Sequence, residues 1–486
     1  MKSNKLGFRF WISILLVGLI GQLAWAIENN YINLWAYSQT GNADAITWMT
    51  ITSSIAATLT TFFIGLLSDR LGKRKLFISI GYIIWGLTVF AFGLFSYHNM
   101  LALSKEQASA ILLVGVFLTL TDNVMTFFGS SSNDAAFNAW VTEHTDDTNR
   151  GKVESVISIL PLLANVLMMG IGLPLHIGSS TNGDDYLNDL IANGTYRDSQ
   201  DALAHGWFLY FLIVGIIVTI VGIISIFLLP KDKCVPNREG SYGKKLIYGF
   251  KPSVIKGNKE LYLLLLTFLC FNSGINAFMP YYLVYFQNPL EYYGANFGIG
   301  LDFYLALVII MGGGSLITVL IGAFLMNKIS QIKLFYISLG VGSIGALGVF
   351  LAGQFGSNHI LLIIFGLLLI TGYLLCTAVL GAAIRNKTPE KDVGLFQGVR
   401  MVFAVLIPMI VGPLISQSLF PITEYNDPTN ANLGGKTPSN VMFLVTLSFF
   451  ALSIIPMFFY QKELKKKKIV SGETTNEETN NNCDAQ

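Results

Sequence analysis

The sequence predicts an all-α polytopic membrane protein with twelve transmembrane helices. Three observations support this prediction: an apolar composition, a series of long apolar runs, and basic residues concentrated in alternate connecting segments. Of the 486 residues, 53% are hydrophobic and 12% are charged, and the mean hydropathy is +0.57. A soluble domain of this length does not carry such a composition, so we expect the chain to reside in a lipid bilayer.

Apolar runs long enough to cross the hydrocarbon core recur along the whole chain. A crossing helix needs roughly 18 or more apolar residues. Continuous runs, rather than two-residue alternation, favour helices over a closed barrel. The runs are centred on residues 10–36, 46–67, 76–97, 110–141, 153–177, 207–229, 260–286, 300–326, 333–354, 359–384, 395–420 and 439–460.

The first run has two interpretations. Basic residues precede it and Ala24-Trp25-Ala26 resembles a signal-peptidase site, which suits a cleaved signal peptide. Charge placement favours a retained helix instead, because cytoplasmic loops hold the excess of Lys and Arg. With the first run kept, both termini are cytoplasmic and 27 of the 31 basic residues fall in inner segments. Glu28 then stays within the membrane.

The remaining composition excludes several classes of protein. The net charge of +2 follows from topology and gives no support to nucleic-acid binding. The four cysteines form no CxxC pair and none lies in an outer loop, so we expect no disulfide and no metal site. The five histidines lack ligand spacing, and no HExxH motif occurs, so we expect neither an enzyme nor a cofactor.

The chain divides near its centre. The inner segment 231–259 is rich in Lys, Pro and Gly and has six expected helices on either side. We expect an N-terminal bundle over 1–230, a cytoplasmic linker over 231–259, a C-terminal bundle over 260–461, and a basic then disordered tail over 462–486. Similar stretches open the fifth and eleventh helices, which favours two parallel repeats of six helices, although composition alone could produce that similarity.

A motif after the second helix points to a family. The stretch "GLLSDRLGKRK" resembles the inner-loop signature of the major facilitator superfamily, between helices two and three. The resemblance implies a twelve-helix transporter whose central cavity opens alternately to each side. It also assigns an inner gate to the motif, here Gly65, Asp69, Arg70, Gly72, Lys73 and Arg74, with Asp69 pairing with basic groups and a helix N-terminus.

Helix four suggests a branch of that family. Its stretch "SSSNDAAFNAWVTEHTDDTNRGKVES" resembles the glycoside-pentoside-hexuronide:cation symporters. A second stretch, "TPEKDVGLFQGVRMVFAVLIPMIVGPL", follows the tenth expected helix and resembles sucrose-type proton symporters of a related branch. An ionisable residue inside a membrane is a functional candidate by default. The resemblance implies that Asp134 accepts hydrogen bonds from sugar hydroxyls. A second sugar-binding acid would lie in helix one, where the nearest acid is Glu28.

The coupling ion is expected to be a proton rather than sodium. Sodium-using members of that branch carry two aspartates in helix two, whereas this helix offers only Thr and Ser. A buried carboxyl can load and release a proton during a transport cycle. The candidates are Glu28, Asp122 and Asp134.

Further substrate-binding candidates are less specific. Trp25 lies one turn from Glu28 and could stack on a sugar ring, and Asn138 shares a helix with Asp134. Asn272 and Asn276 lie one turn apart and could bind a ligand or hold helices together. Arg400 could face the cavity or the inner end of its helix. The alternative for Glu28 is a position at the outer interface, and Asp122 could have a structural partner.

These features predict a multi-pass secondary active transporter of the plasma (inner) membrane that moves a sugar or glycoside by alternating access, coupled to protons. Two alternatives stay open. One is a major facilitator exporter of drug-like, peptide or lipid-like solutes, and the other is a membrane receptor without transport. A cavity rich in Asn, Thr and carboxylates would favour a polyhydroxylated solute over a greasy one.

Overall fold

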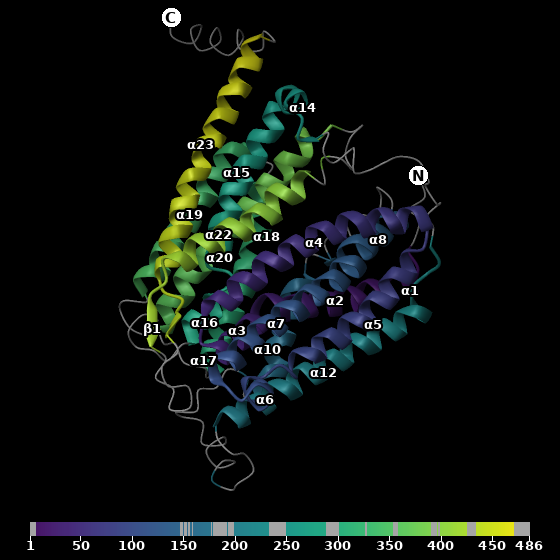
Figure 1. The fold of residues 1–486 in the computed structure, drawn as a ribbon. Coiled ribbons are helices and arrows are strands. Elements are labelled where there is room, and N and C mark those ends of the chain that lie inside the picture. The colour runs from purple at the N-terminus through teal and green to yellow at the C-terminus, as the bar shows by residue number, and fades with distance from the viewer. Residues whose placement is uncertain are drawn as a thin grey trace, which may run out of the picture.

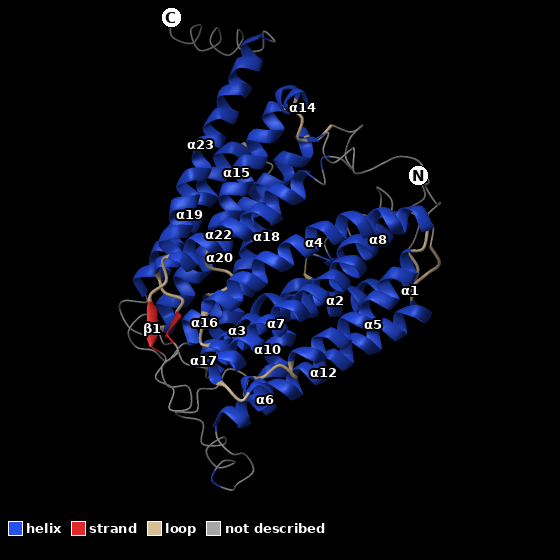
Figure 2. Cartoon of the chain, in the orientation of Figure 1, coloured by secondary structure: helices blue, strands red, loops and turns tan. Residues whose placement is uncertain are grey.

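In the computed structural model, the described residues fold almost entirely into helices (Figure 2). The structure describes residues 6–145, 159–175, 199–232, 249–287, 301–325, 328–352, 358–389, 399–424 and 434–470, with isolated residues at 149, 153, 156, 157, 177, 192 and 396. The tail from 471 onward lies outside the described residues.

Within the described residues, the first half contains five long apolar helical spans and one shorter one, several of them built from consecutive pieces. Its elements are α1 (Phe8–Ser13), η1 (Ile14–Gly18), α2 (Leu19–Ala26), η2 (Ile27–Ile32), α3 (Asn33–Thr40), α4 (Ala43–Leu71), α5 (Arg74–Phe92), α6 (Tyr97–Ser104), α7 (Gln107–Gly129), η3 (Ser130–Phe137), α8 (Asn138–His144), α10 (Leu160–Gly172), η4 (Leu173–Leu175) and α12 (Ser199–Leu228). The first five follow one another without a break and form one span, Phe8–Thr40. Glu28 therefore lies inside a continuous helix.

The described part of the second half is also helical, with more interruptions. Its elements are α14 (Pro252–Gly257), α15 (Lys259–Asn276), α16 (Tyr282–Gln287), α17 (Leu301–Val308), η5 (Ile309–Gly313), α18 (Gly314–Leu325), α19 (Gln331–Ala352), α20 (His359–Lys387), η7 (Val402–Leu406), α22 (Ile407–Ser418), β1 (Ile422–Glu424), β2 (Gly434–Lys436) and α23 (Val441–Val470). The helix α23 continues through the basic stretch that follows the last expected span. Two lysines, Lys387 and Lys467, pair with Glu260 at 2.7 and 2.6 Å and fasten this extension to α15 and α20.

Nine helices within the described residues are long and apolar enough to cross a membrane. The expected spans at 153–177 and 300–326 coincide with the shorter apolar helices Leu160–Leu175 and Leu305–Thr318. The expected span at 260–286 is divided into α15 and α16 by a turn that contains Pro280. Proline lacks the backbone donor that a continuous helix requires, which accounts for a break there. The total of twelve, and the side on which the termini lie, therefore stay predictions.

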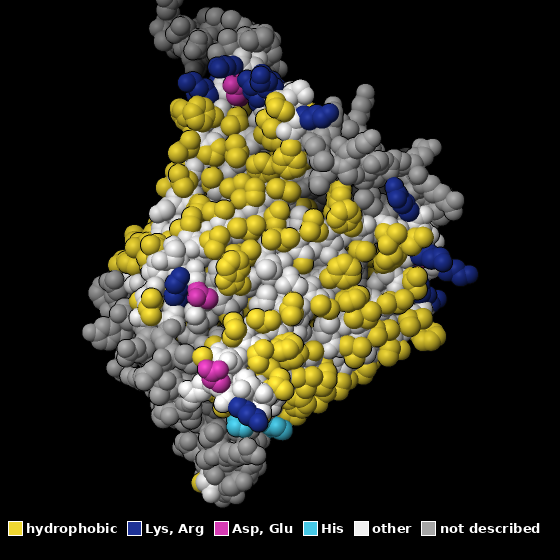
Figure 3. All heavy atoms as spheres, in the orientation of Figure 1, with side chains coloured by type: hydrophobic (Ala, Val, Ile, Leu, Met, Phe, Trp, Pro, Cys, Tyr) yellow, Lys and Arg dark blue, Asp and Glu magenta, His cyan; other side chains and the backbone are white. Residues whose placement is uncertain are grey.

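The outer surface suits a lipid environment. Many large apolar side chains are exposed, among them Leu112 at 68%, Phe227 at 73% and Phe458 at 54%. Figure 3 shows hydrophobic side chains covering the middle of the visible face, while Lys and Arg gather toward its ends. In water such a surface would promote association, whereas lipid tails solvate it.

The two halves meet at one end of the molecule and separate toward the other. In Figure 1 they lie side by side around β1, α3 and α16 and diverge toward α8 and α14. Contacts across this boundary involve α3 with α16, α4 with α22, and α10 with α17. We refer to the end that holds the strands as the hairpin end.

A two-stranded antiparallel sheet at this end was not predicted from the sequence. Strands β1 and β2 pair with Ile422 opposite Lys436 and Glu424 opposite Gly434. This hairpin reaches across to the first half, where the Lys436 amide donates to Asn42 Oδ1 at 3.2 Å and the Lys436 ammonium lies 3.8 Å from Asp44. Thr437 also receives a hydrogen bond from Tyr37 at 3.1 Å. The hairpin therefore ties the two halves together.

Candidate functional site

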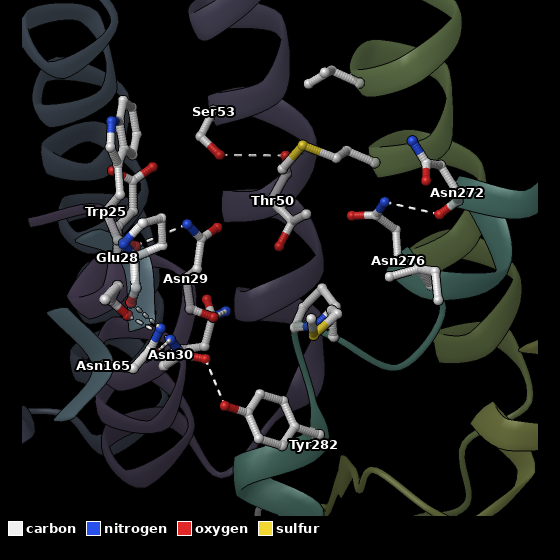
Figure 4. Close-up of a pocket in the computed structure, with 18 of the residues that line it drawn as sticks. Trp25, Glu28, Asn29, Asn30, Thr50, Ser53, Asn165, Asn272, Asn276 and Tyr282 are labelled. Atoms are coloured by element: carbon white, nitrogen blue, oxygen red, sulfur yellow. Dashed lines mark hydrogen bonds between the residues drawn. The ribbon is translucent and has the colours of Figure 1, made fainter. Parts of the chain in front are cut away.

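A cavity of about 450 Å³ lies between the two halves. The first half supplies the lining residues Gln22, Trp25, Ala26, Glu28, Asn29, Asn30, Asn33, Thr50, Ser53, Asp122, Pro161 and Asn165. The second half supplies Asn272, Ile275, Asn276, Met279, Pro280, Tyr282, Met311, Tyr373, Ala404, Val405 and Met409. Figure 4 shows labelled side chains from both halves facing one another across this space.

Three π-helical segments help to build the lining. The segment η2 carries Glu28, Asn29 and Asn30, while η5 carries Met311 and η7 carries Ala404. A π-helical turn inserts an extra residue, changes the direction of the side chains that follow, and occurs often at functional sites. In η2 the acid and two amides consequently reach one cavity from consecutive positions.

Two buried carboxylates form the acidic wall. The Thr126 hydroxyl donates to Glu28 Oε1 at 2.8 Å, and the Ser53 hydroxyl, which lies near Asp122, donates to the Thr50 carbonyl at 3.3 Å. Asp122 and Thr126 are four residues apart on α7, so both side chains lie on the face that meets Glu28. The two carboxylates are close enough to interact electrostatically.

Each of these carboxylates keeps one oxygen without a partner. Glu28 is 8% exposed and Asp122 is 2% exposed, and neither Glu28 Oε2 nor Asp122 Oδ1 has a hydrogen-bond partner among the described residues. No Lys, Arg or His is among the described residues that line the cavity. Burying two unpaired negative charges is very costly, so this wall needs a proton or another cation.

An aromatic pair supports the same wall. The ring of Trp25 lies 5.1 Å from that of Trp85 with an interplanar angle of 59°. Trp85 is fully buried, while Trp25 reaches the cavity from the helix turn before Glu28. The pair holds the indole of Trp25 next to the carboxylate, where one face can contact a ligand.

The opposite wall carries two amides on α15. Asn276 donates to the backbone carbonyl of Asn272 at 2.9 Å, and Asn272 donates to the carbonyl of Ala404 at 2.8 Å. The second bond crosses from α15 to the π-helical segment η7. This bond holds the Asn272 amide against η7 and supplies a hydrogen-bond donor to a backbone carbonyl of that π-helical turn.

The cavity is closed toward the hairpin end. Tyr282 donates to Asn30 Oδ1 at 2.8 Å, and the hydroxyls of Tyr281 and Thr47 lie 2.7 Å apart. Both contacts join the second half to the first. Below them the hairpin adds its own contacts to Asn42 and Asp44.

Some residues expected at the site lie elsewhere. Asp134 is half-buried in η3, where Ser130 donates to its Oδ2 at 3.2 Å and Asn133 lies 3.5 Å from Oδ1. Asn138 is exposed and donates to the Asp134 carbonyl. The Arg400 guanidinium lies beside Gly381 of α20, near Arg385. None of these three is among the described lining residues, whereas Glu28, Trp25, Asp122, Asn272 and Asn276 are.

The predicted gating motif forms a compact junction at the end remote from the hairpin. Gly72 ends α4 with φ of 62°, a left-handed conformation that glycine adopts without strain. The buried Arg74 bonds Glu143 at 3.1 Å, the Gly65 carbonyl at 3.4 Å, and the Ser68 hydroxyl. The side chain of Asp69 lies outside the described part of the structure, and Arg70 is exposed. Arg74 thus ties α4 and α5 to α8.

Several lining residues were not predicted as site residues. Asn29, Asn30, Asn33 and Tyr282 line the cavity, although the sequence patterns did not single them out. Asn165 was missed, although it is an isolated amide within the apolar run "LPLLANVLMM". Polar side chains in the middle of membrane helices are costly without a partner or water, which is the signal that could have indicated it.

The comparison with known families agrees with this architecture. The profile of the Major Facilitator Superfamily matches residues 11–413. The chain belongs to the major facilitator superfamily. No curated protein matches the chain significantly in sequence.

Solved structures of this superfamily resemble the chain over nearly its full length. A mutant form of the nucleoside transporter NupG has a TM-score of 0.63 at 11% identity, covering 92% of this chain and 98% of its own. A D-xylose-proton symporter has a TM-score of 0.63 at 14% identity, covering 93% and 98%. The inward-open xylose transporter XylE from E. coli has a TM-score of 0.62 at 13% identity, covering 92% and 96%.

At sequence identities this low, the structural similarity establishes the fold alone. This member of the superfamily is a multi-pass membrane transporter with an all-helical core, and members of the superfamily are generally not enzymes. The three structural neighbours named above are sugar and nucleoside transporters. The cavity of this chain lies between its two halves.

Proposed function

We propose that this protein is a secondary active transporter that moves a sugar or glycoside across the membrane by alternating access, coupled to protons. The observation that carries the proposal is the cavity between the halves, where side chains from both bundles converge. Amides, hydroxyls and two carboxylates dominate its polar lining, and Trp25 and Tyr282 supply aromatic surfaces. Such a lining suits a small polyhydroxylated solute better than a greasy one.

The proposed path of coupling runs through Glu28 and Asp122. Both carboxylates are buried, each has an oxygen without a partner among the described residues, and both reach the cavity. A proton bound by this pair would offset the cost of burying the second charge. Because the pair lies on the cavity wall, solute binding and opening to either side would alter its access to water.

The proposed binding contacts are Glu28, Trp25, Asn272 and Asn276. Glu28 and Asn276 lie on opposite halves, so a solute that reached both would stabilise the closed intermediate of the cycle. Asp134, the acid that the symporter resemblance assigns to the sugar, would have to act in another conformation or through η3. The resemblance to the glycoside-pentoside-hexuronide branch stays part of this proposal.

Nucleosides are a second candidate class of solute. One structural neighbour is a nucleoside transporter, and a nucleoside presents ribose hydroxyls together with a planar base. The exposed face of Trp25 could stack on that base, as aromatic side chains do on other flat rings. The same cavity would therefore admit either class, and a panel of solutes must contain both.

The test is solute-evoked current from purified protein in liposomes on a capacitive membrane. Mono- and disaccharides and nucleosides are applied at several pH values, with and without sodium. The variants are Glu28→Gln and Asp122→Asn, with Glu106→Gln as a matched control because Glu106 precedes α7 outside the cavity.

A sugar-evoked current that follows pH, ignores sodium and disappears in the first two variants but not in the control would support the proposal. A nucleoside-evoked current with the same properties would show that the solute is a nucleoside rather than a sugar, and it would still support proton coupling through Glu28 and Asp122. Silence across the panel, with the protein shown to be folded, would overturn both.

A further inference from the structure

A second, smaller cavity lies within the second half of the chain. Its volume is about 40 Å³, and its described lining residues come from α16 and the turn before it, and from α17, η5, α19, α20 and α23. Among these residues only Tyr282 carries a hydroxyl, amide or charged group. The small cavity is therefore apolar.

The small cavity adjoins the main cavity. Met279, Tyr282 and Met311 line both of them. Met279 and Met311 are partly exposed, whereas the other described residues that line the small cavity are buried. The exposed part of its lining thus belongs to the wall that it shares with the main cavity. Both methionine side chains are unbranched and flexible, so they can move aside for a group that enters from the main cavity.

The lining of the small cavity suits an apolar occupant better than water. A buried water molecule needs two to four polar partners. The hydroxyl of Tyr282 is the one polar side-chain group among the described lining residues, and it already donates to Asn30 at 2.8 Å. An alkyl group, in contrast, would gain close contacts with the surrounding side chains and lose its contact with water.

The two walls of the main cavity differ in the same sense. Nine of the twelve lining residues from the first half carry an amide, hydroxyl or carboxyl group, and these groups include both donors and acceptors. Only four of the eleven described lining residues from the second half carry such a group. A solute would therefore direct its hydroxyls mainly toward the first half and an apolar substituent toward the second half, where the small cavity opens.

The volume of the small cavity limits the size of that substituent. An apolar cavity of roughly 150 Å³ engineered into another protein binds benzene. The volume of about 40 Å³ in this chain is less than a third of that. It therefore suits a methyl or ethyl group and excludes a phenyl ring.

We infer that the small cavity is a subsite for a short alkyl substituent of the solute, which we call the alkyl subsite. The ligand class is a polyhydroxylated solute that carries one methyl or ethyl group, for example a methyl or ethyl glycoside. The inference rests on the proposed function for the polar part of the solute. It deepens that function by adding a size limit for the apolar part.

The test compares glycosides that differ only in the alkyl or aryl group. The probes are the methyl, ethyl and phenyl glycosides of glucose, galactose and xylose, each in both anomeric forms. Uridine and 5-methyluridine form a second pair in which the polar part is not a simple sugar. Affinity is measured by titration of the ligand-induced shift in melting temperature, with purified full-length protein.

The expected result in the natural protein is a maximum of affinity at the ethyl group. The ethyl glycoside should bind about fourfold more tightly than the methyl glycoside, because burial of one further methylene contributes about this factor. The phenyl glycoside should bind at least fourfold more weakly than the ethyl glycoside, since it exceeds the space. The three probes offer identical hydroxyls, so hydrogen bonding does not account for such a difference.

Two variants show whether the alkyl group lies in the subsite. Val349 and Leu369 line it and are 2% and 3% exposed. Val349→Ile fills the space, so it should abolish the advantage of ethyl over methyl and leave binding of the methyl glycoside within about twofold. Leu369→Ala enlarges the space, so it should admit the phenyl glycoside.

Matched controls lie on α20 outside both cavities. Val379 and Leu380 are 2% and 0% exposed, and neither is among the described residues that line the main or the small cavity. Val379→Ile and Leu380→Ala should therefore keep the order of affinities found for the natural protein. Each control makes the same change of side chain in a buried position, so it accounts for any general loss of stability.

Three outcomes would overturn the inference. One is an ethyl glycoside that nowhere exceeds its methyl counterpart, and another is a phenyl glycoside that equals the ethyl glycoside in the natural protein. The third is an ethyl advantage that persists in Val349→Ile. In each of these cases the glycosides still bind, so the proposed function stands.

The proposed function can also fail by itself. If no glycoside binds, but 5-methyluridine binds more tightly than uridine and Val349→Ile removes that difference, the sugar proposal fails and the alkyl subsite stands. If no probe of either kind binds to the folded protein, both the sugar proposal and the alkyl subsite are overturned.

Discussion

The hydroxyl of Tyr282 donates a 2.8 Å hydrogen bond to Oδ1 of Asn30, and this bond joins the two halves of the protein at the edge of the cavity. Tyr282 begins α16, just after the turn that interrupts the seventh expected span, and Asn30 belongs to the π-helical segment η2. The bond thus connects two irregular segments. Such segments can change conformation without breaking a regular helix, which suits a gate.

Removal of this hydroxyl should weaken closure at the hairpin end. A hydrogen bond contributes about 0.5–1.5 kcal/mol, so Tyr282→Phe should shift the equilibrium between closed and open forms about two- to tenfold toward opening. The measurement is the rate at which a membrane-impermeant maleimide modifies Asn276→Cys from the hairpin side, in a background without native cysteines. Tyr336→Phe on α19 serves as the control, and equal rates in both variants would contradict the prediction.

The hairpin provides a second test of closure. A Cβ atom on Gly435 would collide with the backbone carbonyl of Gly41, across the boundary between the halves. Gly435→Ala should therefore separate the halves at this end, because neither backbone can yield easily. Distances between spin labels on the two bundles should lengthen at the hairpin end. Gly340→Ala is the control, since nothing lies within 4 Å of a Cβ at that position. An unchanged distance distribution in Gly435→Ala would refute the predicted separation of the halves.

Glu28 and Asp134 should differ in their effect on solute binding. Glu28 lines the cavity, whereas Asp134 is bonded within its own segment by Ser130. A hydrogen bond to a charged group contributes about 1.5–3 kcal/mol, so Glu28→Gln should lower affinity roughly ten- to a hundredfold. Asp134→Asn should leave affinity within about threefold.

Titration of the transported solute against both variants measures this difference. If Asp134→Asn abolishes binding and Glu28→Gln does not, the role that the symporter resemblance assigns to Asp134 is right. The cavity geometry described here would then belong to a different step of the cycle.

Arg74 and Glu143 should stabilise the first half of the chain. Their side chains are 6% and 21% exposed and lie 3.1 Å apart. Removal of one partner of a buried ion pair costs about 3–5 kcal/mol, so Glu143→Gln should lower the melting temperature of the detergent-solubilised protein substantially. The exchange Arg74→Glu with Glu143→Arg should restore part of the loss.

An exposed pair supplies the comparison for this measurement. Glu463 and Lys466 lie 3.6 Å apart on α23 and are 31% and 65% exposed. Exposed pairs contribute about 0–1 kcal/mol, so Glu463→Gln should change the melting temperature little. Equal effects of Glu143→Gln and Glu463→Gln would show that Arg74 is not a structural anchor.

Much of the fold could be predicted from the sequence because lipid restricts the choices. The apolar runs and the stretch "GLLSDRLGKRK" led to the superfamily, and the match over residues 11–413 confirmed it. The hairpin Ile422–Lys436 was not predicted, because its strands are three residues each and carry little periodicity. The break before α16 was equally absent from the apolar pattern, although Pro280 marks its position.

The candidate site was predictable only in part. A carboxylate such as Glu28 in a membrane helix is conspicuous, since burial without a partner is costly. Whether it faces the cavity depends on helix rotation and on the π-helical turn at η2, which hydropathy does not report. Asp134 is likewise a carboxylate within an expected membrane helix, yet in the structure Ser130 and Asn133 hydrogen-bond to it inside η3.

The sequence by itself determined that this chain is a helical membrane protein and which polar residues lie within its apolar runs. The reason is that lipid and water solvate each side chain separately, so the composition of a segment and the spacing of its apolar residues already reflect its surroundings. Only the tertiary structure decided that Glu28 and Asp122 share a wall, that Asn276 faces them from the other half, and that Tyr282 closes the space between. Those relationships depend on how helices distant in the sequence rotate and pack, and one-dimensional patterns carry no such information.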